Sequence, residues 1–310
     1  MGLGEAGFDV VAAFDHWKEA CAVYAANFDH PIFNVDLGKI EDVEEFRKWQ
    51  PDVIVGGPPC QDFSSAGKRD ETQGRADLTI SYSRIVAEVR PKWFVMENVQ
   101  QITKSRILPE ARAIFHKAGY GLSQTVLDAS FCGVPQARKR FILVGHLGAE
   151  YGFLDEYLHR NLSAEPTTIH DYLGDSLGLQ HYYRHPRSYA RRAVFSIFEP
   201  SPTIRGVNRP IPKNYAPHPG DTANVTTTNV RELTTIERSY LQTFPKDFKW
   251  PGSKTNLEQM IGNAVPVKLG AYVGRCIMDY VADEKKNDVV KPTKPAKRPA
   301  PQAEDQLILF

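Results

Sequence analysis

The 310-residue chain has few cysteines, no long apolar run and a formal net charge of only +1. Its four cysteines lie far apart, with no C-x-x-C pair and no histidine at metal-ligand spacing, which argues against a zinc site and a disulfide framework. No run of about eighteen apolar residues occurs, and the N-terminus lacks the basic-then-apolar pattern of a secretory signal. We therefore expect a cytoplasmic protein with no membrane segment and no metal. The small net charge says nothing about nucleic acid, so local sequence has to decide.

Apolar and amphipathic segments alternate along the first 150 residues. The predicted strands are "FDVVAAFD", "DVIVGG", "WFVMENV" and "KRFILVGH", and the predicted helices are "HWKEACAVYAANF", "YSRIVAEVR" and "ILPEARAIFHKAGY". This alternation predicts an α/β fold with a mostly parallel sheet covered on both faces, whose ligands bind beyond the carboxyl ends of the strands. Asp15, Asp36, Cys60 and Glu97 fall at or just after predicted strand ends. We therefore expect a site along that edge of the sheet.

The pattern changes near residue 151. Residues 151–251 are irregular and rich in proline and aromatic residues, which predicts a second, smaller domain. Within it, residues 181–213 carry Arg or Lys at seven positions against one acid, and tyrosines lie between them. This bias suits phosphate and base contacts, but an ordinary solvated basic face explains it equally well. Residues 252–283 are expected to return to the first domain, and the charged, proline-rich residues 284–310 are expected to be disordered.

The stretch "VIVGGPPCQDFSSAG" ends a strand in two glycines, two prolines and a cysteine. The prolines fix the backbone, and Gly56 and Gly57 permit close approach of a ligand, so the loop presents the Cys60 thiol. Cys60 is either a nucleophile or a small buried residue in a tight turn. Glu97 ends the next strand, where it is either a partner for the thiol or a helix-capping acid.

Three polar residues occupy every second position at the start of "PQARKRFILVG", namely Gln136, Arg138 and Arg140. Alternate residues of a strand point to one face, so the three side chains are expected to share one. Either they meet a ligand there or they form ion pairs on a surface strand.

Five segments occur in the order and spacing of the cytosine-5 DNA methyltransferases: "GGPPCQDFS", "MENV", "QARKR", "RELTTIERSYLQTFP" and "IGNAVP". The chain resembles this Dcm-like family up to about residue 281. The resemblance implies a Rossmann-like sheet that binds S-adenosyl-L-methionine, in a catalytic domain of residues 1–150. It also implies that residues 151–251 form a target-recognition domain for double-stranded DNA.

The resemblance also implies a mechanism. The Cys60 thiolate would add to carbon 6 of a flipped cytosine while Glu97 donates a proton to ring nitrogen 3. Carbon 5 would then take the methyl group, and loss of its proton with elimination of Cys60 would restore the ring. Arg140, with Arg138 near the backbone, would hold the cytosine carbonyl oxygen.

Further residues match positions of the family that bind the two substrates. The implied cofactor-binding residues are Asp15, His16, Asp36, Leu37, Pro59, Leu78, Asn263 and Val265. The implied DNA-binding residues are Gln61, Ser64, Gln136, Arg184, Thr203, Arg205 and Arg209. His16 stands where the family often has an aromatic residue.

The family opens with a strand and an F-x-G-x-G-G turn, whereas this chain begins with "MGLGEAGFDVV". We expect the natural start to lie upstream, because loss of a central strand would leave backbone groups unpaired. The alternative is a truncated, non-catalytic or partner-complemented DNA-binding relic. The intact catalytic positions favour an active enzyme over a relic.

A thiol-dependent hydrolase is disfavoured, because the loops that flank Cys60 and Glu97 contain no histidine.

The last five residues, "QLILF", resemble the Q-L-x-L-F peptide by which bacterial proteins bind the replication sliding clamp. Its contacts would come from Gln306, Leu307, Leu309 and Phe310. Two alternatives are that the peptide is a permuted first strand of the sheet or that its match is a coincidence.

We expect a bacterial or phage-encoded, nucleoid-associated protein that acts on DNA as a monomer.

Overall fold

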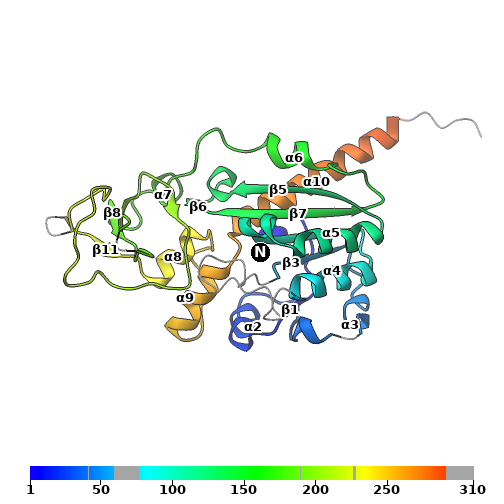
Figure 1. Cartoon of the computed structure of the whole chain (residues 1–310), viewed down its shortest axis with the longest axis horizontal. Coiled ribbons are helices and arrows are strands. Elements are labelled where there is room, and N and C mark those ends of the chain that lie inside the picture. The colour runs from blue at the N-terminus through cyan, green and yellow to red at the C-terminus, as the bar shows by residue number, and fades with distance from the viewer. Residues whose placement is uncertain (41, 59–76, 189, 226–227, 291–310) are drawn as a thin grey trace, which may run out of the picture.

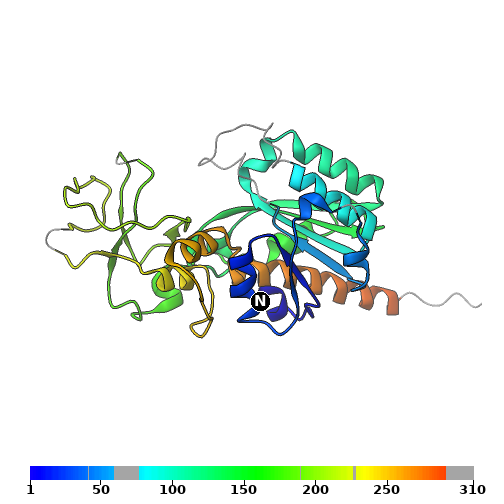
Figure 2. The same cartoon turned by 90° about the horizontal axis from the view of Figure 1, so that it is seen from below.

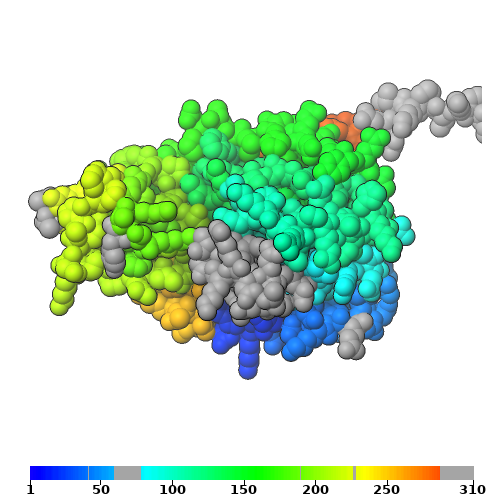
Figure 3. Space-filling view, viewed as in Figure 1, coloured from blue at the N-terminus to red at the C-terminus, as the bar shows by residue number. Residues whose placement is uncertain are grey.

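The computed structural model describes residues 1–40, 42–58, 77–188, 190–225 and 228–290. An α/β body and a smaller lobe lie side by side (Figure 1). The long helix α10 (Val267–Val290) runs along the body. It continues past residue 284, where the sequence predicts that disorder begins. In the space-filling view, which shows one face of the molecule, the lobe lies directly next to the body (Figure 3).

The main sheet has four strands in the order β3-β4-β7-β5. Their bounds are Val53–Gly56 for β3, Trp93–Val99 for β4, Lys139–Leu147 for β7 and Tyr120–Asp128 for β5. β3 and β4 are parallel, but β7 is antiparallel to both of its neighbours. Strands β3, β4 and β5 therefore run in one direction, in line with the prediction of a mostly parallel sheet, and β7 runs against them, which the sequence did not predict. The reason is that β5, which was not predicted, reaches β7 through a short connection, and strands joined without a long crossover are antiparallel.

A second, two-stranded sheet pairs β1 (Ala13–Asp15) with β2 (Ile32–Asn34) in parallel. Helix α2 (Lys18–Ala25) makes the crossover between them, as the sequence predicts. Within the described residues, β1 pairs only with β2, and β3 pairs only with β4. Beyond β2 lie a 3₁₀ turn, η1 (Leu37–Lys39), and the short helix α3 (Glu44–Arg47).

Helices cover both faces of the main sheet. Helices α4 (Asp77–Val89) and α5 (Ile107–Lys117) pack on the face that carries Phe94 and Phe141. The other face carries Trp93 and Ile142, and it packs against α10 and α6 (Asp155–Arg160). Alternate residues of β4 and β7 thus enter opposite cores, as the two-residue period of a strand requires. Helix α6 packs on the body, although the predicted domain boundary near residue 151 assigns it to the second, irregular domain.

The lobe has little regular structure and its own apolar core, which runs from Ile169 to Ile261. Its strand β8 lies between β9 and β11, and its strand β10 pairs with β6 at the edge of the body. The strands are β6 (Gln136–Ala137), β8 (His181–Tyr183), β9 (Val194–Ser196), β10 (Ser201–Pro202) and β11 (Arg231–Glu232). The helices and 3₁₀ turns not yet described are α1 (Gly2–Glu5), η2 (Gln100–Lys104), η3 (Ala129–Cys132), α7 (Ile169–Leu173), α8 (Thr235–Leu241) and α9 (Lys254–Asn263).

Helix α9 and the hydrogen bonds of Asn27 are two of the links between the lobe and the body. Viewed from below, α9 lies between them, next to the N-terminal segment (Figure 2). Asn27, just after α2, exchanges two hydrogen bonds of 2.8 Å with the backbone of Lys249, just before α9. In the described parts of the chain, no helix is long and apolar enough to cross a bilayer, and no group of three or more metal-ligating side chains occurs.

Candidate active site

Glu97 and Arg140 form a pair where β4 ends and the antiparallel strand β7 begins. Arg140 Nε lies 2.8 Å from Glu97 Oε1, and the two side chains are only 12% and 16% exposed. Burial raises the pKa of Glu97, and the positive charges of Arg140 and Arg138 oppose that rise. The carboxyl group is therefore easier to protonate than an exposed glutamate, although a guanidinium touches it.

The chain that leads to Cys60 lies against this pair. A Cβ on Gly57 would lie 3.2 Å from Glu97 Oε2, so the glycine lets the backbone approach the carboxyl group closely. Asn98 Nδ2 donates to the carbonyl oxygen of Pro58 at 3.2 Å. Cys60, Pro59, Gln61 and Ser64 lie outside the described residues. The described backbone thus stops two residues before the predicted nucleophile, held beside Glu97.

Tyr82 of α4 supports the same strand ends, and sequence reasoning missed it. Its buried hydroxyl group lies 2.9 Å from the carbonyl oxygen of Val95 and 3.2 Å from that of Ile54, so its proton is shared between β4 and β3. A Cβ on Gly56 would lie 2.4 Å from the Tyr82 ring. The only hint in the sequence was Gly56 itself, because a glycine at the end of a strand marks a close approach.

Asp15 and Asp36 follow two neighbouring parallel strands, at the same edge of the small sheet. Asp15 is level with Asn34 of β2, and its Oδ1 accepts from the backbone N–H of Trp17 at 2.8 Å. Asp36 Oδ1 accepts from the N–H of Gly38 at 3.0 Å, which, together with Lys39, lowers the pKa of Asp36. Two carboxyl groups at one edge can accept hydrogen bonds from the hydroxyl and amino groups of a nucleoside.

Other predicted cofactor residues lie close to these carboxylates. A Cβ on Gly38 would lie 2.9 Å from Leu78 Cδ2, so Leu78 forms an apolar wall beside the turn that contains Leu37. His16 is largely exposed, with Nδ1 3.6 Å from Asp15 Oδ1. An apolar wall beside two carboxylates fits the adenosine part of S-adenosylmethionine.

Asn263 and Val265 lie at the end of α9. Asn263 is exposed, and its Oδ1 accepts from Gln259 Nε2 at 3.0 Å, while Val265 packs on the core of the body.

The structure separates Gln136 and Arg138 from Arg140, although the sequence predicted a shared face. Arg138 is 1% exposed, and its guanidinium donates to the carbonyl oxygens of Ile204, Gly262 and Ala264 at 3.0–3.1 Å. Gln136 is fully buried and bonds to Ile204 and to the end of α8. The separation arises because β6 ends at Ala137 and β7 begins at Lys139, so strand alternation breaks at Arg138.

The predicted DNA-binding residues of the lobe gather around the segment 203–205. Arg184 donates to the carbonyl oxygen of Thr203 at 2.7 Å, and Thr203 Oγ1 donates to the carbonyl oxygen of Ala137 at 2.9 Å. Arg205 donates to the carbonyl oxygen of His185. Burial and the nearby charge of Arg205 lower the pKa of Arg184 to about 10. Arg209 is exposed.

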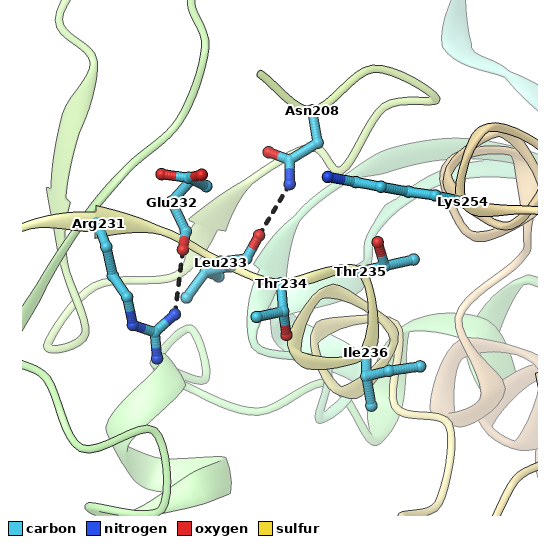
Figure 4. A pocket seen from close by; sticks show the side chains of 8 residues that line it. All are labelled: Asn208, Arg231, Glu232, Leu233, Thr234, Thr235, Ile236 and Lys254. Atoms are coloured by element: carbon cyan, nitrogen blue, oxygen red, sulfur yellow. Dashed lines mark hydrogen bonds between the residues drawn. The ribbon is translucent and has the colours of Figure 1, made fainter. Parts of the chain in front are cut away.

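A pocket of about 450 Å³ opens elsewhere, on the lobe (Figure 4). Residues 231–236 line it together with Asn208 and Lys254. Asn208 Nδ2 donates to the carbonyl oxygen of Leu233, and Arg231 donates to that of Glu232 (Figure 4). None of the predicted site residues lines this pocket.

Comparison with known proteins identifies the family. The model of the family described as C-5 cytosine-specific DNA methylase matches residues 1–279. The chain belongs to this family. It is similar to the type II methyltransferase M.HindV of Haemophilus influenzae, with 58% identity over 90% of this chain and 92% of that protein. It is also 50% identical to the type II methyltransferase M.HgiDI of Herpetosiphon aurantiacus, over 91% of each chain.

Solved structures confirm the predicted class of fold for this cytosine-5 methylase. The chain resembles the Dnmt2 methyltransferase of S. pombe with a TM-score of 0.68, 19% identity, and coverage of 91% of this chain and 95% of that one. A putative DNA modification methyltransferase of an E. coli prophage gives a TM-score of 0.66 at 21% identity, with coverage of 91% and 95%. The predictions of a DNA (cytosine-5-)-methyltransferase and of S-adenosylmethionine as its methyl donor are confirmed by the family.

Proposed function

We propose that this methylase modifies carbon 5 of a cytosine that is flipped out of a specific site in double-stranded DNA. The observation that carries the proposal is the buried Glu97–Arg140 pair beside Pro58, two residues before Cys60. Carbon 5 of cytosine is a poor nucleophile, so the enzyme has to make the ring electron-rich. A thiol, a carboxyl group that is readily protonated and a guanidinium are the groups that this activation needs.

The chemistry assigns a bond or a proton to each group. The Cys60 thiolate forms a bond to carbon 6 while Glu97 gives its proton to nitrogen 3, and carbon 5 becomes enamine-like. S-adenosylmethionine, when bound, supplies an electrophilic methyl group. Carbon 5 takes this methyl group, and nitrogen 3 returns its proton to Glu97. Loss of the proton from carbon 5 to a base such as water, with departure of the thiolate from carbon 6, then restores the aromatic ring. The raised pKa of Glu97 suits this role, because the carboxyl group must carry a proton when cytosine enters.

Arg140 has two tasks in this proposal. Its Nε holds Glu97 and its Nη1 donates to the carbonyl oxygen of Lys139 at 2.8 Å, and in the proposal this fixed guanidinium would also hold the cytosine carbonyl oxygen. Arg138 would support the site by holding the backbone of Ile204 and Gly262, without contact to the base.

The cofactor would bind along the edge of the small sheet. Asp15 would accept from the ribose hydroxyls, and Asp36 with Leu37 would contact the adenine. His16, Pro59, Leu78, Asn263 and Val265 would complete the site, as the family resemblance implies.

DNA would bind between the body and the lobe, and Gln61 and Ser64, which follow Cys60 in the sequence, would contact it. Thr203, Arg205 and Arg209 would contact the duplex. Arg184 and Gln136 would act through the backbone that they hold in place, because both are engaged with neighbouring segments.

The test is methyl transfer from labelled S-adenosylmethionine to unmethylated duplex DNA, followed by nucleoside analysis and bisulfite sequencing. We expect 5-methylcytosine at one short sequence and no transfer by Cys60→Ala. Cys276→Ala is the matched control, since Cys276 lies in α10 and its thiol donates to the carbonyl oxygen of Tyr157, away from the proposed site residues. Methylation of adenine, or transfer that persists in Cys60→Ala, would contradict the proposal.

We propose further that the enzyme serves a bacterial restriction-modification system in the cytoplasm and acts on nucleoid DNA as a monomer. The support comes from the names of its relatives, which are type II methyltransferases. Protection of host DNA from a co-expressed endonuclease with the same recognition sequence tests this role.

The C-terminal "QLILF" peptide is proposed to bind the bacterial sliding clamp. The peptide lies outside the described residues, so the sequence alone supports this partner. A synthetic peptide of residues 301–310 is expected to bind the clamp at micromolar concentration. The same peptide with Leu307→Ala and Phe310→Ala is expected to lose binding, and equal binding by both peptides would contradict the proposal.

A further inference from the structure

Three successive carbonyl groups of the lobe each accept a hydrogen bond from a different arginine. The carbonyl oxygen of Thr203 accepts from Arg184, that of Ile204 from Arg138, and that of Arg205 from Arg238. A backbone segment fixed in this way has no freedom to shift without breaking several buried hydrogen bonds.

The same segment lies directly against the end of α9. A Cβ on Gly262 would lie 2.2 Å from the backbone nitrogen of Gly206 and 2.4 Å from the carbonyl carbon of Arg205. The two backbones therefore touch, with no side chain between them. The next residue after Gly262 is Asn263, the first of the two cofactor residues on this side.

Buried side chains span this contact. Arg138 donates from one guanidinium to Ile204 on the lobe side and to Gly262 and Ala264 on the α9 side. Gln136 Oε1 accepts from the N–H of Ile204 at 2.8 Å, and Gln136 Nε2 donates to Gln242 Oε1 at 2.9 Å.

Gln242 completes the connection to α9. Its Nε2 donates to the carbonyl oxygens of Ile261 at 2.5 Å and Ala264 at 3.2 Å. Gln136 and Gln242 are both fully buried. The hydrogen bonds thus run from Ile204, through two glutamines, to the segment that carries Asn263 and Val265.

We propose that this junction of Gln136, Arg138 and Gln242 couples the two substrates, so that DNA bound at residues 203–206 strengthens cofactor binding at residues 263–265. The inference rests on the proposed function, which gives Thr203 and Arg205 to DNA and Asn263 and Val265 to the cofactor. Because the junction is close-packed, both segments have to move together. Coupling is reciprocal, so the cofactor strengthens DNA binding by the same factor.

The experiment measures the Kd of S-adenosylhomocysteine by calorimetry, with and without a saturating duplex that carries the recognition sequence mapped by bisulfite sequencing. The wild-type enzyme is expected to bind S-adenosylhomocysteine about tenfold more tightly when DNA is present. Gln242→Met keeps the side-chain volume but removes both hydrogen bonds to α9, so its ratio of Kd values is expected to approach one. Gln124→Leu on β5 is the control, and it is expected to keep the wild-type ratio.

The outcomes separate this inference from the proposed function. A wild-type enzyme that methylates no cytosine overturns the proposed function and, with it, the inference. An active enzyme with a ratio of one, or a Gln242→Met variant with the wild-type ratio, overturns the inference alone. Weaker binding of both ligands at an unchanged ratio also overturns it, since that result indicates a purely structural role. If Gln242→Met does not fold, Arg138→Lys takes its place, because one ammonium group cannot bridge both sides of the junction.

Discussion

At the scale of single residues, the environment of Glu97 explains why a glutamate can act as an acid here. An exposed glutamate is almost fully ionised at neutral pH. Burial beside the sheet raises the pKa of Glu97, and Arg140 limits that rise while it fixes the carboxyl group in place. The two effects together give an oriented group that can carry a proton.

Replacement of this carboxyl group tests the assignment. Glu97→Gln cannot give a proton to nitrogen 3, so we expect kcat to fall by about 10²- to 10⁴-fold. The KM for DNA should change little, because the amide fills the same space. Steady-state methyl transfer measures both constants, with Glu110→Gln on the exposed face of α5 as the control. A Glu97→Gln enzyme with wild-type kcat would remove Glu97 from the mechanism.

His146 gives a prediction about pH. Its ring stacks on Trp93 with centroids 4.0 Å apart, and burial lowers its pKa from 6.5, although Glu284 partly opposes this. Protonation of a histidine whose pKa is lowered by folding destabilises the folded protein. The contribution of neutral His146 to the free energy of unfolding is therefore complete above pH 6.5, and it is lost as the pH falls through 6.5 towards the pKa of the folded state.

We therefore expect the Tm of the wild type to fall more between pH 7.5 and pH 5.5 than the Tm of His146→Phe, which keeps the stacked ring but cannot be protonated. His116→Gln, at an exposed position, should follow the wild type. Parallel curves for all three proteins would show that His146 does not titrate in this range.

At the scale of secondary-structure elements, close contacts between elements fix the ends of the strands. Gly56→Ala would place a methyl group against the Tyr82 ring, and overpacking of this kind costs about 1–3 kcal/mol of unfolding free energy. Urea denaturation measures the loss. Gly4→Ala in α1 is the control, because no atom lies within 4 Å of the added Cβ. Equal stability of the two variants would mean that Tyr82 moves aside freely.

Helices α8 and α9 share a buried ion pair of Arg238 and Glu258, each 5% exposed. Glu258→Gln leaves the Arg238 charge buried without a counter-charge, so we expect a loss of about 3–5 kcal/mol. The exposed pair of Arg47 and Glu44 provides the comparison, and Glu44→Gln should cost less than about 1 kcal/mol. Thermal and urea denaturation would show both effects, and a small loss in Glu258→Gln would mean that water reaches Arg238.

The sequence predicts some elements well and others poorly, for physical reasons. Strands β3 and β4 were found because each is a nearly continuous run of apolar residues. Strand β5 was missed because its residues are mixed in polarity, and its antiparallel pairing depends on a short connection whose path the sequence does not show. The motifs predicted that Glu97 lies beside the cysteine loop and that Arg140 serves the same base, but they did not show the ion pair between the two. That pair and the roles of Tyr82 and Asn98 depend on contacts between distant segments.

At the scale of the whole molecule, a sheet body and an irregular lobe meet at several contacts, of which the junction of Gln136, Arg138 and Gln242 is buried. The body holds the carboxylates at the sheet edge and the Glu97–Arg140 pair, and the lobe presents the arginine-held segment 203–205. Gln136 and Arg138, which the sequence grouped with the catalytic and DNA-binding residues, lie in that junction. Helix α9 reaches both parts, so in the proposed reaction the relative position of lobe and body would decide whether a flipped base can meet the cofactor.

The most direct test of the central claim is covalent trapping on DNA with 5-fluorocytosine at the mapped target. Fluorine cannot leave carbon 5 as a proton does, so the Cys60 adduct cannot be eliminated after methyl transfer. We predict a stable protein–DNA complex in the presence of S-adenosylmethionine, with one added methyl group and the nucleotide attached to the Cys60 peptide in mass spectra. Attachment at another residue, or a methyl group on the exocyclic nitrogen with no covalent complex, would contradict the account.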